Sequence, residues 1–289
     1  MQTAAAMLPE FAAAPVPFAP LDPMLASAMT GRRTFEDYLP GGVFGFGYVL
    51  EPKLDGYRLI VHKRGGEILA HSRAGNLRPL PAAVVAAIRL LPDGIYDGEL
   101  LAPSGKSWGV TVGENFDRLQ LVLFDVVEVL GVAIAGQPYT ERRAALTLAI
   151  AHVGDSAHLM IVPSVPVSHE ALAAIYAAGG EGAMLKRTTS IYYPGYRTAE
   201  WIKVVPKRRA TVTVTGFKAG SFGPHATILV RADDGTVTKV KTKNHALLRA
   251  IALDPASYIG RRLVISYRER TPSGSFRHPM FDHWAGEGE

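Results

Sequence analysis

Glu51-Pro52-Lys53-Leu54-Asp55-Gly56-Tyr57-Arg58 holds the strongest chemical signal in this chain. Its lysine stands two residues before an aspartate and three before a glycine, where a predicted strand meets a turn. A Lys amine attacks an electrophile such as phosphorus only when it is neutral, and desolvation or nearby cations lower its pKa from about 10.4. Taken alone, the pattern is also typical of a surface lysine beside a turn. Other parts of the sequence are needed to distinguish whether Lys53 is a nucleophile or a solvated side chain.

Strands and helices are both predicted around this stretch. Helical spacing of apolar residues and end signals predict helices at Pro81–Leu91, Thr140–His152 and His169–Ala178. The pattern also predicts strands at Tyr48–Leu50, Tyr57–Lys63, Glu67–Ser72 and, as a nearly continuous apolar run, Leu119–Val129. We therefore expect an α+β domain of antiparallel sheets flanked by helices.

The pattern of apolar and polar residues changes near Lys207. Short alternating segments follow, with one predicted helix at His245–Leu253; the segments are Thr211–Lys218, Ala226–Arg231, Thr236–Lys241 and Arg261–Arg268. Roughly five strands and one helix in about eighty residues are typical of a small OB-type barrel. The predicted organisation is a loosely ordered Ala/Pro-rich lead-in at 1–20, a first domain at 21–207 and an OB-fold domain at 208–289.

Charge is distributed unevenly along the 289 residues. The net charge is +5, but residues 207–289 hold 14 Lys and Arg against 7 Asp and Glu, whereas residues 1–206 hold 17 against 19. Excess positive charge at one end suits binding to a phosphate backbone, and a solvated basic surface is the alternative.

The composition excludes several classes of protein. There is no Cys, so disulfides and Cys-ligated zinc are excluded and a reducing compartment is suitable. No apolar run is long enough to span a bilayer, and the N-terminus lacks the pattern of a signal peptide. We therefore expect a cytoplasmic protein, nucleoid-associated or in a host cytoplasm if phage-encoded, with no membrane partner.

The stretch around Lys53 resembles the nucleotidyl-lysine motif of the covalent nucleotidyltransferases, which include DNA ligases, RNA ligases and mRNA capping enzymes. The resemblance implies that Lys53 forms the phosphoramide bond to the nucleotide. It also implies that Glu51 and Arg58 belong to the nucleotide site, with Arg58 near the bound nucleotide and the nick phosphate.

Five further elements resemble motifs of that family, in the same order and over some 150 residues. They are Arg73-Ala74-Gly75 (R-x-G), Asp97-Gly98-Glu99 (D-G-E), Phe124-Asp125 (F-D), Glu181-Gly182-Ala183-Met184-Leu185-Lys186 (E-G-x-x-x-K) and Trp201-Ile202-Lys203 (W-x-K). The resemblance implies that the nucleotide is contacted by Arg73, Glu99, Phe124, Lys186 and Lys203. Each element alone has a structural alternative, such as a turn arginine or a core phenylalanine, but six in order make coincidence very improbable.

The resemblance also implies the cofactors. The substrate would be ATP, and Glu99 and Glu181 would supply oxygen ligands to Mg²⁺ or Mn²⁺. Positive charge from Lys186 and Lys203 would stabilise a polyphosphate and could lower the pKa of Lys53. The sequence has no glycine-rich P-loop, which disfavours a Walker-type NTPase.

Within the superfamily, the chain is most similar in motif to short bacterial and phage ATP-dependent DNA ligases, related to the ligase part of bacterial end-joining enzymes. Pro23-Met24-Leu25-Ala26, Glu141-Arg142-Arg143 and two late stretches carry this similarity; the late stretches are 266–271 and 274–279. The implied activity is sealing of 5′-phosphate/3′-hydroxyl nicks in double-stranded DNA, by a protein that we expect to be a monomer.

Two positions depart from the ligase pattern. Val205 stands where a second lysine usually follows the W-x-K element, and Lys207 is a candidate replacement. After Phe281 there is no equivalent of the R-x-D-K element that orients pyrophosphate, so slow self-adenylation is expected, with Arg270 or Arg277 as candidate substitutes. An RNA ligase, a capping guanylyltransferase and a non-catalytic nucleic-acid-binding protein remain the alternatives.

Overall fold

The computed structural model describes residues 18–29, 33–102, 116–179, 181–206, 208–220, 223–268, 270–271 and 274–286. The chain forms two compact units that each draw on distant segments. The first comprises Met1–Ala26, Asp55–Val162 and Thr188–Ala199, and the second comprises Ser27–Leu54, Pro163–Arg187 and Glu200–Glu289. The predicted lead-in at 1–20 lies mostly outside the described residues, as does Lys207 at the predicted domain boundary; the boundary stays a prediction.

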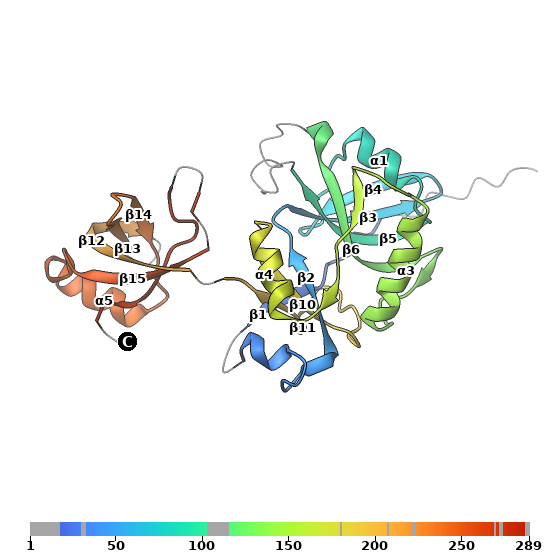
Figure 1. Cartoon of the computed structure of the whole chain (residues 1–289). Helices are drawn as coiled ribbons and strands as arrows, with labels where there is room; N and C mark the ends of the chain where they lie inside the picture. The colour runs from blue at the N-terminus through green and yellow to red at the C-terminus, as the bar shows by residue number, and fades with distance from the viewer. Residues whose placement is uncertain are drawn as a thin grey trace, which may run out of the picture. The chain divides into compact units, whose positions relative to one another are not determined.

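A mixed sheet forms the centre of the first unit (Figure 1). Its strand order is β4-β3-β5-β6-β7, with β8 pairing in parallel to β6. The strands are β3 (Tyr57–Arg64), β4 (Glu67–Ser72), β5 (Gly94–Leu101), β6 (Gln120–Val129), β7 (Val132–Ala133) and β8 (Leu159–Ile161). All pairs other than β6–β8 are antiparallel.

Alternation along these strands separates a core face from a polar face. The core face packs against helices α1 (Ala82–Ile88) and α3 (Tyr139–Ala151), and its buried residues include Leu59, Val61, Tyr96, Leu100, Leu121 and Leu123. The opposite face of β3 and β5 carries Arg58, Asp97 and Glu99. The two-residue alternation that buries the apolar side chains on one face of the sheet therefore places these three charged side chains on the other face.

The second unit contains a five-stranded sheet with the order β1-β11-β10-β2-β9. Its elements are β1 (Leu25–Ala28), β2 (Tyr48–Lys53), β9 (Val165–Pro166), α4 (His169–Ala177), β10 (Gly182–Arg187) and β11 (Arg197–Val204). Apolar side chains on one face form a core with Ile175 of α4; they are Leu50, Ala183, Leu185, Ile202 and Val204. Because side chains alternate, the motif residues of these strands lie on the other face.

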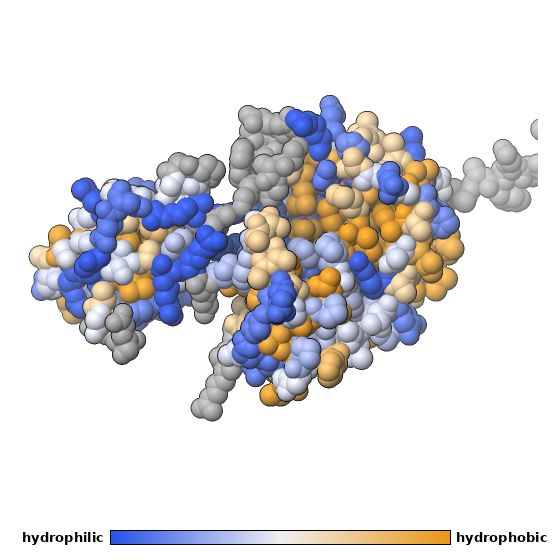
Figure 2. All heavy atoms as spheres, viewed as in Figure 1, coloured by the Kyte–Doolittle hydropathy of each residue, from blue (hydrophilic) through white to orange (hydrophobic). Residues whose placement is uncertain are grey.

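The C-terminal part of the second unit is an antiparallel sheet of order β14-β13-β12-β15-β16. Its elements are β12 (Arg208–Gly220), β13 (Gly223–Ala232), β14 (Val237–Val240), α5 (His245–Leu253), β15 (Arg262–Tyr267) and β16 (Met280–Trp284). A bridge between Lys241 and Met280 links the ends of β14 and β16, which brings the two edge strands together as in a barrel. Hydrophilic residues cover much of the surface of this sheet in the view of Figure 2.

The predicted α+β class with an all-β C-terminal part is confirmed. Strand β16 was not predicted as a strand, because Pro279 and the short run Met280–Trp284 carry little alternation. Four short 3₁₀ helices complete the described elements: η1 (Phe35–Tyr38), η2 (Gly45–Gly47), η3 (Phe116–Arg118) and η4 (Pro255–Tyr258). Among the described residues, the helices are all too short or too polar to cross a bilayer.

Candidate active site

Lys53 lies at the end of β2, opposite Gly182 at the start of β10. Its amine donates a hydrogen bond to the Glu181 carboxylate, which stands immediately before β10. The two residues are 128 positions apart in the sequence. Antiparallel pairing of β2 with β10 therefore places the predicted nucleophile directly beside the predicted metal-binding carboxylate.

A buried ion pair lies further along the same face of this sheet. Lys186 Nζ is 2.8 Å from a Glu51 carboxylate oxygen, and both side chains are only 2% exposed. The Lys186 amine also lies 4.5 Å from the centroid of the Trp201 ring, close enough for a cation–π contact. Lys186 and Glu51, both predicted to bind nucleotide, thus contact each other on the sheet face that carries Lys53.

Lys203 completes the predicted set in the second unit. It pairs with Met184, which pairs on its other side with Glu51, so the three side chains point to one face. Lys203 is partly exposed, as a phosphate contact requires. The structure gathers Lys53, Glu51, Glu181, Lys186 and Lys203 on one surface of one sheet.

Gly182 and Gly56 are positions where only glycine fits. A Cβ on Gly182 would lie 2.5 Å from the carbonyl oxygen of Val204, and one on Gly56 would lie 2.3 Å from that of Leu100. The close approach at Gly56 lets its amide N–H donate to Glu99 Oε1 at 3.0 Å. The glycines of the K-x-D-G and E-G-x-x-x-K elements are therefore required by backbone packing.

Arg58 is held by a bidentate ion pair in the first unit. Its Nε donates to Asp97 Oδ1 at 2.9 Å and its Nη2 to Asp97 Oδ2 at 2.6 Å. Burial by itself would lower the pKa of the Arg58 guanidinium. The charge and hydrogen bonds of Asp97 have the larger combined effect, so the pKa of Arg58 lies above its ordinary value. Arg58 is therefore a permanent, oriented cation.

Phe124 and Arg73 were predicted to contact the nucleotide from the first unit. The Phe124 ring centroid lies 5.3 Å from the Arg58 guanidinium carbon, and the residue is partly exposed. Arg73 is an exposed residue of the turn after β4, where the Ser72 amide donates to the carbonyl of Asn76. The structure thus brings Arg58, Phe124 and Asp97 together and leaves Arg73 on a turn.

Asp125, the second residue of the F-D element, has a structural partner. Its carboxylate accepts from Arg142 Nε at 2.8 Å and Nη2 at 2.9 Å, and both side chains are fully buried. Arg142 also donates to the carbonyls of Gln137 and Ser190. These contacts of Arg142 join β6, α3 and the segment before β11.

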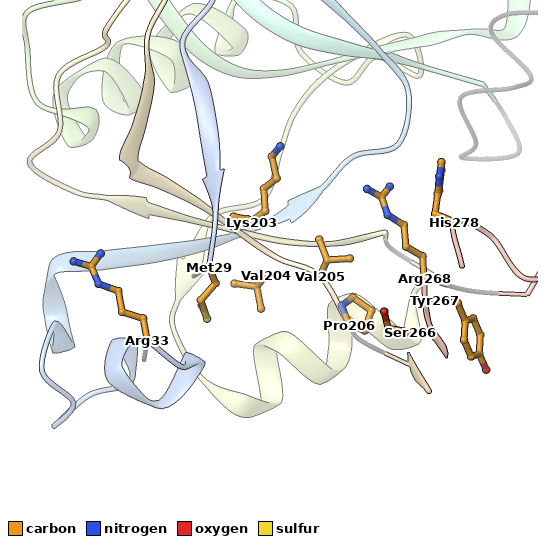
Figure 3. A pocket seen from close by; sticks show the side chains of 11 residues that line it. Met29, Arg33, Lys203, Val204, Val205, Pro206, Ser266, Tyr267, Arg268 and His278 are labelled. Carbon is orange, nitrogen blue, oxygen red and sulfur yellow. The ribbon is translucent and has the colours of Figure 1, made fainter. Parts of the chain in front are cut away.

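A cationic pocket lies in the second unit (Figure 3). Its lining includes Arg33, Lys203, Arg268 and His278, and Arg268 and His278 extend in the same direction in this view. Arg268 Nη1 also donates to Glu181 Oε1. The charges of Arg33, Lys203 and Arg268 suit this pocket to an anion such as a phosphate group.

The suggested substitutes for the R-x-D-K element lie in the C-terminal sheet. Arg270 donates to Thr236 Oγ1 and to the Gly274 carbonyl, pairs with Asp234 at 2.9 Å and stacks 3.6 Å from the Phe276 ring centroid. These contacts tie Arg270 to its own sheet. Arg277 accepts at its carbonyl from the Arg268 amide. Neither placement tests the suggested pyrophosphate role, which stays a prediction.

The carboxylates of Glu181 and Glu99 fit the chemistry of Mg²⁺, which prefers oxygen ligands. Among the described residues no three acidic or His side chains gather at one point. Mg²⁺ is usually held by one or two carboxylates together with water and substrate phosphates. The Glu181 oxygens accept from Lys53 and Arg268, and Glu99 Oε1 accepts from the Gly56 amide.

Two residues of the site were missed by sequence reasoning. Asp97 was assigned to the D-G-E element without a partner, and Tyr192 was not singled out at all. The Tyr192 hydroxyl donates to Asp97 Oδ2 at 2.7 Å. No local pattern could reveal this contact, because it joins residues 95 positions apart.

Comparison with known families decides the assignment. The model of the ATP dependent DNA ligase domain matches residues 23–204, which is more than half of the chain and includes the six nucleotidyltransferase elements from Glu51 to Lys203. The chain belongs to the ATP-dependent DNA ligase family. The match covers the stretch around Lys53, and the relatives that follow are bacterial ligases.

Two relatives illustrate the similarity. A probable DNA ligase of Mycobacterium sp. (strain KMS) is 31% identical over 218 residues, covering 70% of this chain and 40% of its own. DNA ligase C2 of Mycolicibacterium smegmatis is 27% identical over 249 residues, covering 76% of this chain and 65% of its own. This ligase-family chain thus spans about two fifths of the length of the first of these relatives.

Solved structures show the same fold. A Lig E DNA ligase structure aligns with a TM-score of 0.67 and 22% identity, covering 82% of this chain and 92% of its own. The ligase domain of M. tuberculosis LigD aligns with a TM-score of 0.57 and 23% identity, covering 93% and 96%. The α+β arrangement followed by an all-β part is therefore the ligase fold.

Proposed function

We propose that this chain is an ATP-dependent DNA ligase that adenylates Lys53 and then seals nicks in double-stranded DNA. The observation that carries the proposal is the contact between the Lys53 amine and the Glu181 carboxylate. It joins the two motif residues that the chemistry needs side by side. Membership of the ligase family supports the reaction class.

The first step is an in-line displacement at phosphorus. The neutral Lys53 amine attacks the α-phosphorus of ATP, an N–P bond forms, the bond to the leaving pyrophosphate breaks, and the amine loses a proton. Glu181 accepts a hydrogen bond from that amine, so it can orient Lys53 and receive its proton. Lys203 lies on the same sheet face and would neutralise phosphate charge.

The second and third steps occur on DNA. A 5′-phosphate oxygen at the nick attacks the lysyl-AMP phosphorus and forms a phosphoanhydride, while the N–P bond breaks and the released Lys53 amine takes up a proton. The 3′-hydroxyl then loses its proton, attacks the activated 5′-phosphate and expels AMP. Positioning and charge neutralisation supply most of the rate in such displacements. Arg58, an oriented cation in the first unit, is the proposed contact to the nick phosphate.

Mg²⁺ or Mn²⁺, when bound, would neutralise phosphate charge and help the leaving group depart. Glu181 and Glu99 are the residues that would hold it. The basic C-terminal sheet would bind the DNA backbone, so binding should be nearly independent of sequence and steeply dependent on salt.

Incubation with α-³²P-labelled ATP and Mg²⁺ tests the first step. We expect label on the wild type and none on Lys53→Ala. Lys63→Ala is the matched control, because Lys63 pairs with Asp93 instead. An unlabelled wild type, or equal labelling of Lys53→Ala, would contradict the assignment of the nucleophile, and label taken from GTP would indicate a capping enzyme.

Preadenylated substrates test the later steps separately. Sealing of a preadenylated DNA nick is expected, with weaker sealing of RNA ends. Preference for RNA would support an RNA ligase. Failure to seal any preadenylated nick would support a non-catalytic binding protein.

A further inference from the structure

The Tyr192 hydroxyl is held in a defined orientation inside the first unit. It accepts a hydrogen bond from the Met24 amide at 3.2 Å and a long one from Arg58 Nη2 at 3.5 Å, and it donates to Asp97 Oδ2 at the shorter distance of 2.7 Å. Burial, and then the charge of Asp97, raise the pKa of Tyr192 well above its ordinary value. The hydroxyl is therefore always protonated, and its proton points to Asp97.

The segment that leads to Tyr192 is anchored by three hydrogen bonds. The Thr140 amide donates to the Thr188 carbonyl at 3.1 Å, and Arg142 Nη1 donates to the Ser190 carbonyl at 2.8 Å. The Tyr192 amide itself donates to the Ala135 carbonyl at 2.8 Å. These contacts place the hydroxyl without help from a ligand.

Asp97 links the fixed Tyr192 hydroxyl to the Arg58 guanidinium. The carboxylate is fully buried, and its two oxygens engage Arg58 Nε and Nη2. Because a guanidinium is planar, two bonds along one edge fix its plane and the direction of Nη1. The bond from Tyr192 to Oδ2 resists rotation of the carboxylate, and so of the guanidinium.

We propose that Tyr192 is a positioning residue that acts through Asp97 to aim Arg58 at the phosphate of the nick. The inference rests on the proposed function, in which Arg58 contacts DNA rather than the charging step at Lys53. Tyr192 should therefore affect the steps on DNA more than self-adenylation.

Tyr192→Phe removes only the hydroxyl, and Tyr96→Phe is its matched control. Tyr96 is also fully buried in the first unit, but its hydroxyl donates to the Pro92 carbonyl at 2.7 Å, on the core face of the sheet. Each variant is measured for self-adenylation with labelled ATP and for single-turnover sealing of a preadenylated nick. Both are also made in an Arg58→Ala background, to give a double-mutant cycle.

We expect Tyr192→Phe to slow sealing about ten-fold and to change self-adenylation less than about three-fold, because misplaced groups mainly affect the step they serve. In the Arg58→Ala background the further loss should vanish, since a residue acting through another has no separate effect. Tyr96→Phe should seal like the wild type.

Sealing by Tyr192→Phe at the rate of Tyr96→Phe would overturn the proposal, as would an equal loss with and without Arg58. If Tyr192→Phe unfolds at a lower temperature than Tyr96→Phe, the double-mutant cycle is repeated with Asp97→Asn in place of Tyr192→Phe, because Asp97→Asn keeps the side-chain shape. If the losses in sealing rate from Asp97→Asn and Arg58→Ala are additive, the proposal is also overturned. A wild type that seals no nick contradicts the proposed ligase function instead.

Discussion

Lys186 and Glu51 form an ion pair of 2.8 Å in which each side chain is only 2% exposed. They lie on neighbouring strands and on the face of the sheet that carries Lys53. The pair is both a predicted part of the nucleotide site and a buried structural contact. These two roles can be separated.

Glu51→Ala should lower the free energy of unfolding by about 3–5 kcal/mol, because it removes the carboxylate beside a buried amine. The double variant Glu51→Met/Lys186→Met should regain most of that stability. Chemical denaturation measures both. If the double variant is stable and still labels with ATP at the wild-type rate, neither residue is needed for nucleotide binding.

Glu181→Gln keeps the shape of the side chain beside Lys53 but removes its charge. We expect self-adenylation to slow by roughly 100-fold and the Mg²⁺ concentration for half-maximal rate to rise, since a carboxylate ligand is lost. Glu170→Gln, in the exposed first turn of α4, is the control. An unchanged Mg²⁺ midpoint in Glu181→Gln would argue against a metal role for this residue.

Arg142→Met should be strongly destabilising. Arg142 is fully buried with Asp125 and also donates to two carbonyls, so its loss leaves a buried carboxylate without this partner. The expected decrease in unfolding free energy is about 3–5 kcal/mol, measured by thermal or urea denaturation. Arg89→Met, at the exposed end of α1, should change stability far less; equal effects would contradict the structural role of Arg142.

Stability should decrease at acidic pH because of His62. Burial, and then the neighbouring His71, lower the pKa of His62 to about 4; Arg64 adds to the decrease and Glu128 opposes it. His71 Nδ1 faces the Ser72 carbonyl, so it donates there, and its Nε2 accepts from Leu21 and from His62. His62 Nε2 therefore donates to His71, and burial favours the neutral form of His62.

The unfolded chain takes up this proton below about pH 6.5, whereas the folded chain takes it up only near pH 4. The contribution of His62 to stability is thus present above pH 6.5 and falls as the pH falls toward 4, by about 3 kcal/mol at most. Denaturation at pH 7 and pH 4.5 checks this. His62→Gln retains a donor but does not titrate, so it should lose less stability between the two pH values than the wild type.

Local patterns were enough to predict most elements. The apolar spacing of Thr140–His152 and His169–Ala178 corresponds to α3 and α4 within one residue at each end. The strand predicted at Leu119–Val129 is β6. These succeeded because period and end signals depend on neighbours in the chain. Strand β16 was missed because a short edge strand next to a proline has little periodicity of its own.

The sequence by itself determined the family, the order of the motifs and the identity of Lys53 as the candidate nucleophile, because motif spacing is a property of the chain. Only the tertiary structure decided which charged groups meet. Lys53 contacts Glu181, Arg58 is held by Asp97 and Tyr192, and Asp125 is used by Arg142. Such pairings depend on strand register and on segments packed from far along the chain. Within a strand, a register shift by one residue would turn its side chains to the other face of the sheet.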